Sequence, residues 1–189
     1  VTCSQCGACG EGLFYPAKIG KRFRDNNVVG AAPYYRVYNN MQSLMDRGRD
    51  PLTVLIDRAH DKGMECIASL RVGPQGATDP SQDSKAGGPG FLNKEMRDHN
   101  LELLRELAID YPSDGIELDL AAPPSGSSPL FRPEDAAEHT PLMTDWVRSV
   151  SEMVHARPGG PGAVCARVYP NEETNLRVGY DVQTWPSEG

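Results

Sequence analysis

Hydrophobic residues recur along this chain in two alternating patterns. In three segments they lie three and four positions apart, which is the spacing of a helix with one buried face. These segments begin at Pro51, after Asn93 and at Thr140, and each is followed by a short apolar run of strand length. The strands predicted in this way cover residues 64–72, 115–120 and 163–169.

Residues typical of helix ends support these boundaries. Asp50 is placed to cap the first helix and Gly63 to end it, while Asn93 is placed to cap the second helix and Pro112 to stop it. A fourth, shorter helix is predicted over residues 171–178. The chain therefore alternates helices and strands at the lengths that are typical of βαβ units.

Strands that alternate with helices of this length form a parallel sheet, so the predicted fold class is α/β. An open sheet and a closed barrel give the same alternation. The connections from helix to strand are tight, whereas residues 73–92 and 121–139, which follow strands, form long loops rich in Gly, Pro and Ser. Because parallel barrels build their sites from the loops after the strands, these two loops mark the expected functional face.

The first part of the chain differs in composition from the rest. Residues 1–27 are rich in Cys and Gly, end in a basic stretch, and are left unassigned as a leader. Residues 28–38 carry valines and tyrosines, and an early strand is predicted there, broken or ended near Pro33. We therefore divide the chain into a leader, residues 1–27, and an α/β part, residues 28–189.

Three of the five cysteines lie close together at the start of the chain. Cys3, Cys6 and Cys9 have the spacing of zinc or iron–sulfur ligands, but no fourth ligand follows, so we expect no metal site. Cys66 and Cys165 lie inside apolar runs, where a free cysteine usually behaves as a small buried hydrophobic residue.

Composition excludes several kinds of partner. The net charge is -7, and Lys and Arg do not cluster, so a nucleic-acid partner is not expected. The longest apolar runs are far shorter than the roughly 20 residues of a membrane helix, so no membrane span is expected.

Two acidic residues define the candidate site. Side chains alternate along a strand, so Glu117 and Asp119 project to one side of theirs while Leu118 projects to the other. The neighbouring predicted strands place Arg71 and Arg167 in corresponding positions near the strand ends. Such a cluster is typical of functional sites, but a layer of ion pairs that only fills the interior remains an alternative.

Four segments carry a family resemblance: DPLTVLIDRAHDKGMECIASLRV, YPSDGIELDL, TPLMTDWVRSV and ARVYPNEETNLRVGYDVQTW. In this order they resemble the glycoside-hydrolase-like family 10 domains. The resemblance implies a (β/α)₈ TIM-type barrel that acts on carbohydrate, needs no cofactor, and is extracellular or in the cell envelope. Such a barrel needs ~250 residues, so five or six strands would fit here and the chain is expected to be part of a longer protein.

The resemblance and the residues together suggest roles for individual side chains. Asp119 or Glu117 would be the general acid/base of a glycosidase, and Asp181, or a residue beyond the chain, would be the second carboxylate. Asp119 lies nearer the end of its strand and is expected to be the more important acid, with Glu117 deeper and paired with an arginine. The side chains expected to orient the sugar and the carboxylates are Arg71, Arg167 and Tyr169.

Two positions depart from the family pattern. Ala121 stands where the chitinase-type signature has its proton-donating Glu, and Val72 stands where relatives continue the strand with Met. The chitinase mechanism is therefore not supported by these residues. The departures favour an alternative hypothesis, in which the domain binds carbohydrate or is structural and has lost hydrolase activity.

Overall fold

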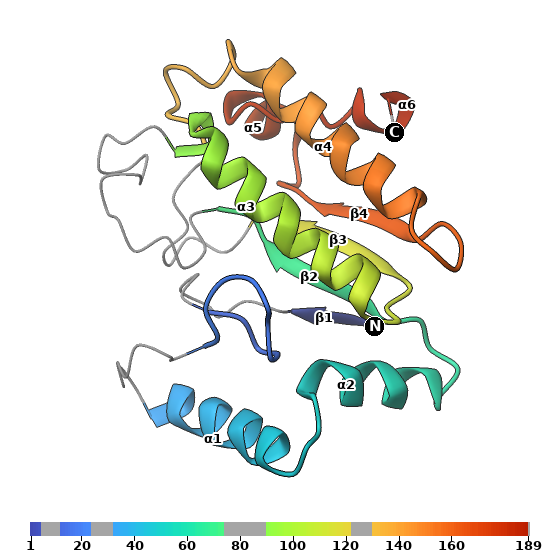
Figure 1. Cartoon of the computed structure of the whole chain (residues 1–189). Coiled ribbons are helices and arrows are strands. Elements are labelled where there is room, and N and C mark those ends of the chain that lie inside the picture. The colour runs from blue at the N-terminus through green and yellow to red at the C-terminus, as the bar shows by residue number, and fades with distance from the viewer. Residues whose placement is uncertain (5–11, 24–31, 74–89, 122–129, 189) are drawn as a thin grey trace.

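The computed structural model describes residues 1–4, 12–23, 32–73, 90–121 and 130–188. Its centre is an open parallel sheet with four strands in the order β1-β2-β3-β4 (Figure 1). The strands are β1 (Thr2–Ser4), β2 (Ile67–Arg71), β3 (Gly115–Asp119) and β4 (Ala163–Arg167). Each strand pairs with the next one along the chain.

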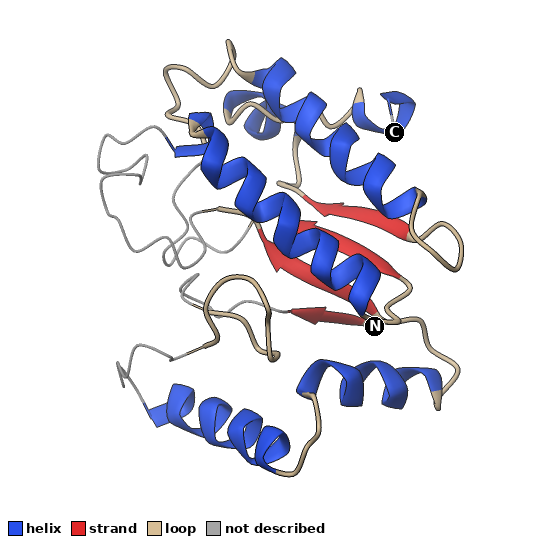
Figure 2. Ribbon diagram, viewed as in Figure 1, coloured by secondary structure: helices blue, strands red, loops and turns tan. Residues whose placement is uncertain are grey.

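Helices connect the strands, and two of them form a layer over one face of the sheet (Figure 2). The helices are α1 (Ala32–Asp46), α2 (Pro51–His60), α3 (Lys94–Arg105), α4 (Thr140–His155), α5 (Glu172–Arg177) and α6 (Trp185–Glu188), with a short 3₁₀ turn at Gly90–Leu92 and a π-helical turn at Glu106–Asp110. Helices α3 and α4 cross the same face of the sheet side by side (Figure 1). Helices α1 and α2 lie near the β1 end, and α5 and α6 near the β4 end.

The predicted helix ends are confirmed. Asp50 accepts hydrogen bonds from the backbone amides of Leu52 at 2.8 Å and Thr53 at 3.4 Å, and so caps α2. Asn93 caps α3 through the amide of Glu95 at 2.9 Å. Gly63 adopts a φ of 69° after α2, a left-handed conformation that glycine reaches without strain.

The core lies between the sheet and the α3–α4 layer. Ala68 and Leu70 of β2, and Ile116 and Leu118 of β3, are fully buried on this side of the sheet. They pack in one cluster with apolar residues of the two helices, which include Leu103, Leu104, Met143 and Val150. Burial of the larger of these side chains, at about 2 kcal/mol each, holds the two helices on the sheet.

The prediction of a TIM-type barrel with five or six strands is wrong. The described residues form an open sheet of four strands, and none of them pairs with the outer edge of β4. After β4 the described chain continues in the short helices α5 and α6. The alternation of strands and helices is confirmed, but it is the same in open and closed sheets, and only the resemblance implied closure.

The strand predicted over residues 28–38 is also wrong where the structure describes it. Residues 24–31 lie outside the described part, and residues 32–38 belong to α1. Pro33 falls in the first turn of this helix, where a proline costs no hydrogen bond because the amides there have no helical partner. The proline that we interpreted as a strand breaker therefore marks a helix start.

Part of the leader packs on the main body. The buried carboxylate of Glu106 accepts hydrogen bonds from the Lys18 amide at 2.7 Å and from the Tyr15 hydroxyl at 3.4 Å. The Tyr15 ring meets Tyr111 edge to face, with the ring centroids 5.4 Å apart. The leader also supplies β1, so its described residues contribute to the sheet and the core, whereas the division at residue 27 stays a prediction.

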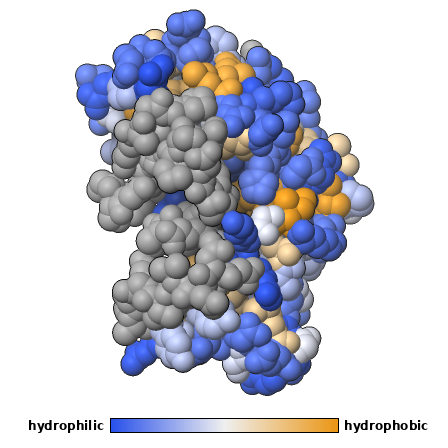
Figure 3. Space-filling model, turned by 60° about the vertical axis from the view of Figure 1, so that its left-hand side comes forward, coloured by the Kyte–Doolittle hydropathy of each residue, from blue (hydrophilic) through white to orange (hydrophobic). Residues whose placement is uncertain are grey.

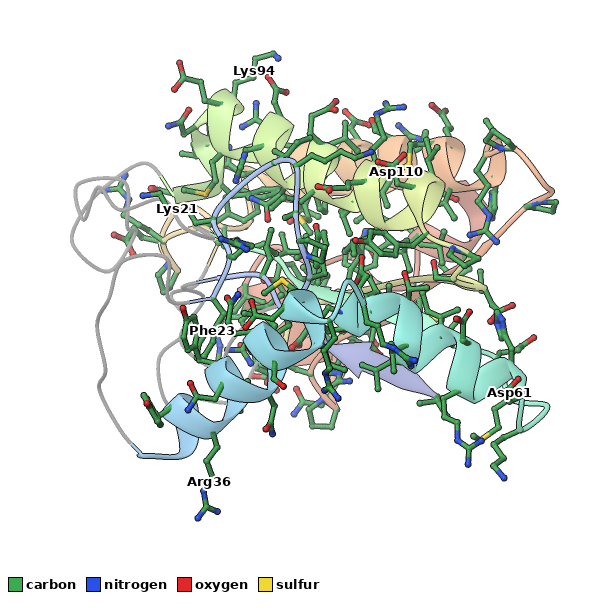
Figure 4. All side chains as sticks on the ribbon, turned by 60° about the horizontal axis from the view of Figure 1, so that its bottom comes forward. Lys21, Phe23, Arg36, Asp61, Lys94 and Asp110 are labelled. Atoms are coloured by element: carbon green, nitrogen blue, oxygen red, sulfur yellow. The ribbon has the colours of Figure 1, made fainter. Side chains whose placement is uncertain are left out.

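Hydrophilic residues cover most of the described surface in the view of Figure 3, with small hydrophobic patches between them. Arg36 of α1 and Lys94 of α3 point away from the body of the protein (Figure 4). Within the described ranges, no helix combines the length and the hydrophobicity needed to cross a membrane.

A side-chain contact between His60 and Asp114 joins α2 to the start of β3. Asp114 Oδ2 accepts a hydrogen bond from the Cys66 amide at 2.6 Å and lies 2.8 Å from His60 Nε2. Burial raises the pKa of Asp114, but the hydrogen bonds from Cys66 and His60, together with electrostatic attraction to His60 and Arg157, lower it by more, so this pKa lies below its ordinary value. A carboxylate with a depressed pKa in the folded state stabilises the fold above its unfolded pKa.

We predict that Asp114→Asn lowers the free energy of unfolding at neutral pH and removes part of its pH dependence. The difference between the wild type and the variant should shrink as the pH falls from about 4, near the unfolded pKa, through the lower folded pKa, below which the wild-type carboxylate is protonated in both states. Urea denaturation followed by circular dichroism at several pH values measures this difference. A gap that stays constant down to the lowest pH would contradict the assigned contact.

Candidate functional site

The face of the sheet opposite to α3 and α4 is polar. The parallel register aligns Ser69, Glu117 and Cys165 in one row across β2, β3 and β4. The next row, toward the ends of the strands, aligns Arg71, Asp119 and Arg167. We call these six residues the polar face. The structure thus brings together four of the six predicted site residues.

Glu117 holds the centre of the first row. Its Oε1 accepts hydrogen bonds from Ser69 Oγ at 2.7 Å and from Arg167 Nη2 at 2.8 Å. The side chain of Glu117 is 14% exposed, whereas that of Arg167 is 50% exposed. Glu117 is therefore paired with an arginine, as expected, but with one that remains largely hydrated.

Asp119 is more buried than Glu117 and has fewer hydrogen bonds among the described residues. Arg71 Nε lies 3.7 Å from Asp119 Oδ2, and the two side chains are 15% and 7% exposed. This distance suits an ionic contact but exceeds that of a hydrogen bond. Asp119 Oδ1 is buried, and no group among the described residues donates a hydrogen bond to it.

An unfilled acceptor of this kind is unusual. A buried carboxylate oxygen without a donor costs about 1–3 kcal/mol or more, and native proteins normally fill such a position with a protein group, water or ligand. Asp119 Oδ1 therefore has the capacity to accept a hydrogen bond from a hydroxyl or amide group of a bound molecule.

The expected depths of the two acids are reversed. We predicted Glu117 to lie deeper because it precedes Asp119 along the strand, but Asp119 is the more buried of the two. The prediction assumed a closed barrel, in which depth follows the strand direction. In an open sheet, burial depends on which neighbours lie beside each row, and Glu117 has the exposed strand β4 on one side.

The other two predicted site residues, Tyr169 and Asp181, form hydrogen bonds with residues close to them in the sequence. The Tyr169 amide donates to Asn175 Oδ1 at 2.9 Å, and its carbonyl accepts from Asn175 Nδ2 at 3.0 Å, which ties the end of β4 to α5. Asp181 accepts a hydrogen bond from Thr184 Oγ1 at 2.7 Å, within the turn that leads to α6. Asp181 is thus bound within its own turn, no contact among the described residues joins it to the polar face, and its role as the second carboxylate stays a prediction.

The two cysteines of the sheet region differ. Cys66 is fully buried, as expected, but Cys165 is exposed, contrary to its prediction. Cys165 was expected to be buried because its strand is apolar, yet β4 is an edge strand and remains accessible. Among the described residues no group of three or more Cys, His, Asp or Glu could hold a metal ion, and Cys6 and Cys9 lie outside them.

The role of Ser69 was not anticipated. The sequence placed it on the same side of its strand as Arg71, but a serine in an apolar run gives no further signal. Its hydrogen bond to Glu117 becomes visible only once the register of β2 and β3 is known.

Comparison with known proteins assigns no family to the chain. No protein-family model matches the chain, and no curated protein matches it. The resemblance to glycoside-hydrolase-like family 10 domains therefore stays a prediction.

We predict that the two acids of the polar face differ in their effect on stability. Asp119→Asn removes the carboxylate charge that lies 3.7 Å from the mostly buried Arg71 and should lower the free energy of unfolding by about 2–4 kcal/mol. Glu117→Gln keeps an acceptor for Ser69 and leaves a hydrated Arg167, so its cost should stay below about 1 kcal/mol.

Chemical denaturation of both variants at neutral pH measures the two costs. Asp98→Asn, which removes the charge of an exposed acid paired with Lys94, provides the matched control and should cost little. A larger loss for Glu117→Gln than for Asp119→Asn would show that the assigned order of burial is wrong.

Proposed function

We propose that the polar face binds carbohydrate. The observation that carries this proposal is the buried oxygen Asp119 Oδ1, which receives no hydrogen bond from the described residues. Sugars present many hydroxyl groups, each of which can donate a hydrogen bond to a carboxylate and accept one from an arginine. A hydroxyl bound at Asp119 would supply the missing donor.

The neighbouring groups suit the same class of ligand. Arg167 is half exposed at the edge of the polar face and can donate further hydrogen bonds while it remains paired with Glu117. The mixture of fixed acceptors and donors on one strand row matches the alternating hydroxyls of a sugar ring better than it matches a purely anionic ligand, because Asp119 and Glu117 would repel an anion.

A second candidate function, glycoside hydrolysis, rests on a separate observation. Glu117 and Asp119 project from the same side of β3 two residues apart, which corresponds to roughly 7 Å along a strand. Carboxyl groups in glycosidases lie about 5–10 Å apart. In this hypothesis Asp119 serves as the general acid/base, and Glu117 is the second carboxylate in place of Asp181.

Binding is tested by isothermal titration of the full chain with soluble cello-, chito-, xylo- and malto-oligosaccharides. For any oligosaccharide that binds, Asp119→Asn should weaken affinity about tenfold, because the hydroxyl then donates to a neutral amide oxygen instead of a charged carboxylate. Asp98→Asn should leave affinity unchanged, and circular dichroism at the assay temperature confirms that each variant is folded.

The release of reducing sugar from the same oligosaccharides separates the two functions. Cleavage that Asp119→Asn abolishes would support hydrolysis, while binding without cleavage would support the binding module alone. If no oligosaccharide binds, or if Asp119→Asn binds as tightly as the wild type, the proposal is wrong.

A further inference from the structure

Strand β4 presents an unpaired edge. In its parallel pairing with β3, the Ala163 amide donates to the Asp114 carbonyl, and the Arg167 carbonyl accepts from the Leu120 amide, both at 3.0 Å. Because alternate residues of a parallel strand bond to the same neighbour, the backbone groups of Val164 and Ala166 point to the opposite side. No described strand pairs with them there.

A groove of about 390 Å³ lies along this edge. On one side it is bounded by β4, and on the other by Val182 and by Trp185 and Pro186 of α6. Its floor is the face of α4 that carries Thr144, Val147, Arg148, Ser151 and His155. The groove therefore combines free backbone hydrogen-bonding groups with an apolar lining, which is the pattern that an added strand requires.

The shape of the groove favours one type of binding partner. A second copy of this chain would have to bring the edge of a whole sheet against β4, with its own helix layer. The wall formed by Trp185 and Pro186 limits the space beside β4, and a single extended segment fits this space better. The repeat of amide and carbonyl groups at Val164 and Ala166 also matches an extended polypeptide backbone.

The charge of the groove lining indicates which side chains an occupant should carry. Although the chain has a net charge of -7, the residues that line the groove include Arg148 and His155 and no acidic residue. Arg148 pairs with Asp145 at 2.5 Å on the exposed side of α4, and His155 Nδ1 lies 3.3 Å from Ser151 Oγ. An acidic side chain of the occupant would face these basic groups across the groove.

We propose that the free edge of β4 binds an extended peptide of a partner protein, with apolar residues at alternate positions and an acidic residue among them. The peptide adds to the sheet as a strand next to β4. Its apolar side chains enter the groove over α4, and the intervening side chains lie on the side of the polar face. This interaction is independent of carbohydrate binding.

The test uses a fluorescein-labelled peptide, acetyl-Thr-Val-Thr-Glu-Thr-Val-Thr, in which Glu points to the same side as the valines, and fluorescence anisotropy with the full chain. Two further versions carry N-methyl groups on the odd or on the even amides. Methylation of the amides that face β4 should weaken binding about tenfold or more, because each methyl group removes a backbone hydrogen bond to β4, while methylation of the other set should have little effect. Absence of binding, or equal effects of the two sets, would overturn the proposal.

Two variants locate the peptide on the protein. Ala166→Pro removes one of the outward amides of β4 and should weaken binding at least tenfold, with circular dichroism as the check of folding. Arg148→Gln should weaken the peptide with Glu but not its Glu→Gln version, because only the former has the charge that Arg148 attracts. If Arg148→Gln weakens both peptides equally, the charge assignment is wrong.

The oligomeric state is measured alongside by light scattering. The proposal predicts a monomer at micromolar concentration. A dimer that Ala166→Pro dissociates would assign the edge to a second copy of the chain and overturn the peptide as its occupant.

Discussion

The structure depends above all on the parallel pairing of β2 with β3. This pairing aligns Ser69 with Glu117 and Arg71 with Asp119, and by alternation it sends Leu70 and Leu118 to the other side. The apolar side is buried by α3 and α4, so the register has little freedom: a shift by one residue would drive charged side chains into the core. The same hydrogen bonds that build the sheet therefore also assemble the polar face.

The two ion pairs of the polar face differ in their burial and in their contribution to stability. Glu117 accepts hydrogen bonds from Ser69 and Arg167 through one oxygen, and the arginine remains in contact with solvent, so the pair contributes little to stability. Arg71 and Asp119 are mostly buried, their contact is longer than a hydrogen bond, and one oxygen of Asp119 lacks a donor among the described residues. A protein that retains a buried charge in such a state gives up stability, which is typical of sites that are completed by a ligand.

Local signals in the sequence predicted much of the fold. Asp50, Asn93 and Gly63 mark helix ends because their side chains or backbone conformations act within a few residues, and the apolar runs found three of the four strands. Strand β1 was missed because it is only three residues long and lies in a region whose cysteines suggested a different role. Pro33 was misinterpreted because a proline is compatible both with the end of a strand and with the first turn of a helix.

Features that depend on distant parts of the chain were not predictable in this way. Closure of a sheet, the exposure of Cys165 and the relative depth of Glu117 and Asp119 all depend on what lies beside β4, and periodicity carries no information about that neighbour. The grouping of the four charged residues was predictable, because equivalent positions of adjacent parallel strands meet at the same end of a sheet. Their partners were not, because pairing depends on side-chain conformations.

The central claim is that Arg71 and Asp119 form a mostly buried ion pair within the polar face, and that each stabilises the other. A double-mutant cycle with Arg71→Gln, Asp119→Asn and the combined variant measures this coupling through the free energies of unfolding. The structure predicts a coupling energy of about 1–3 kcal/mol, with the double variant less destabilised than the sum of the single ones. Additive effects, within about 0.5 kcal/mol, would show that the two residues are independent and would contradict this account of the site.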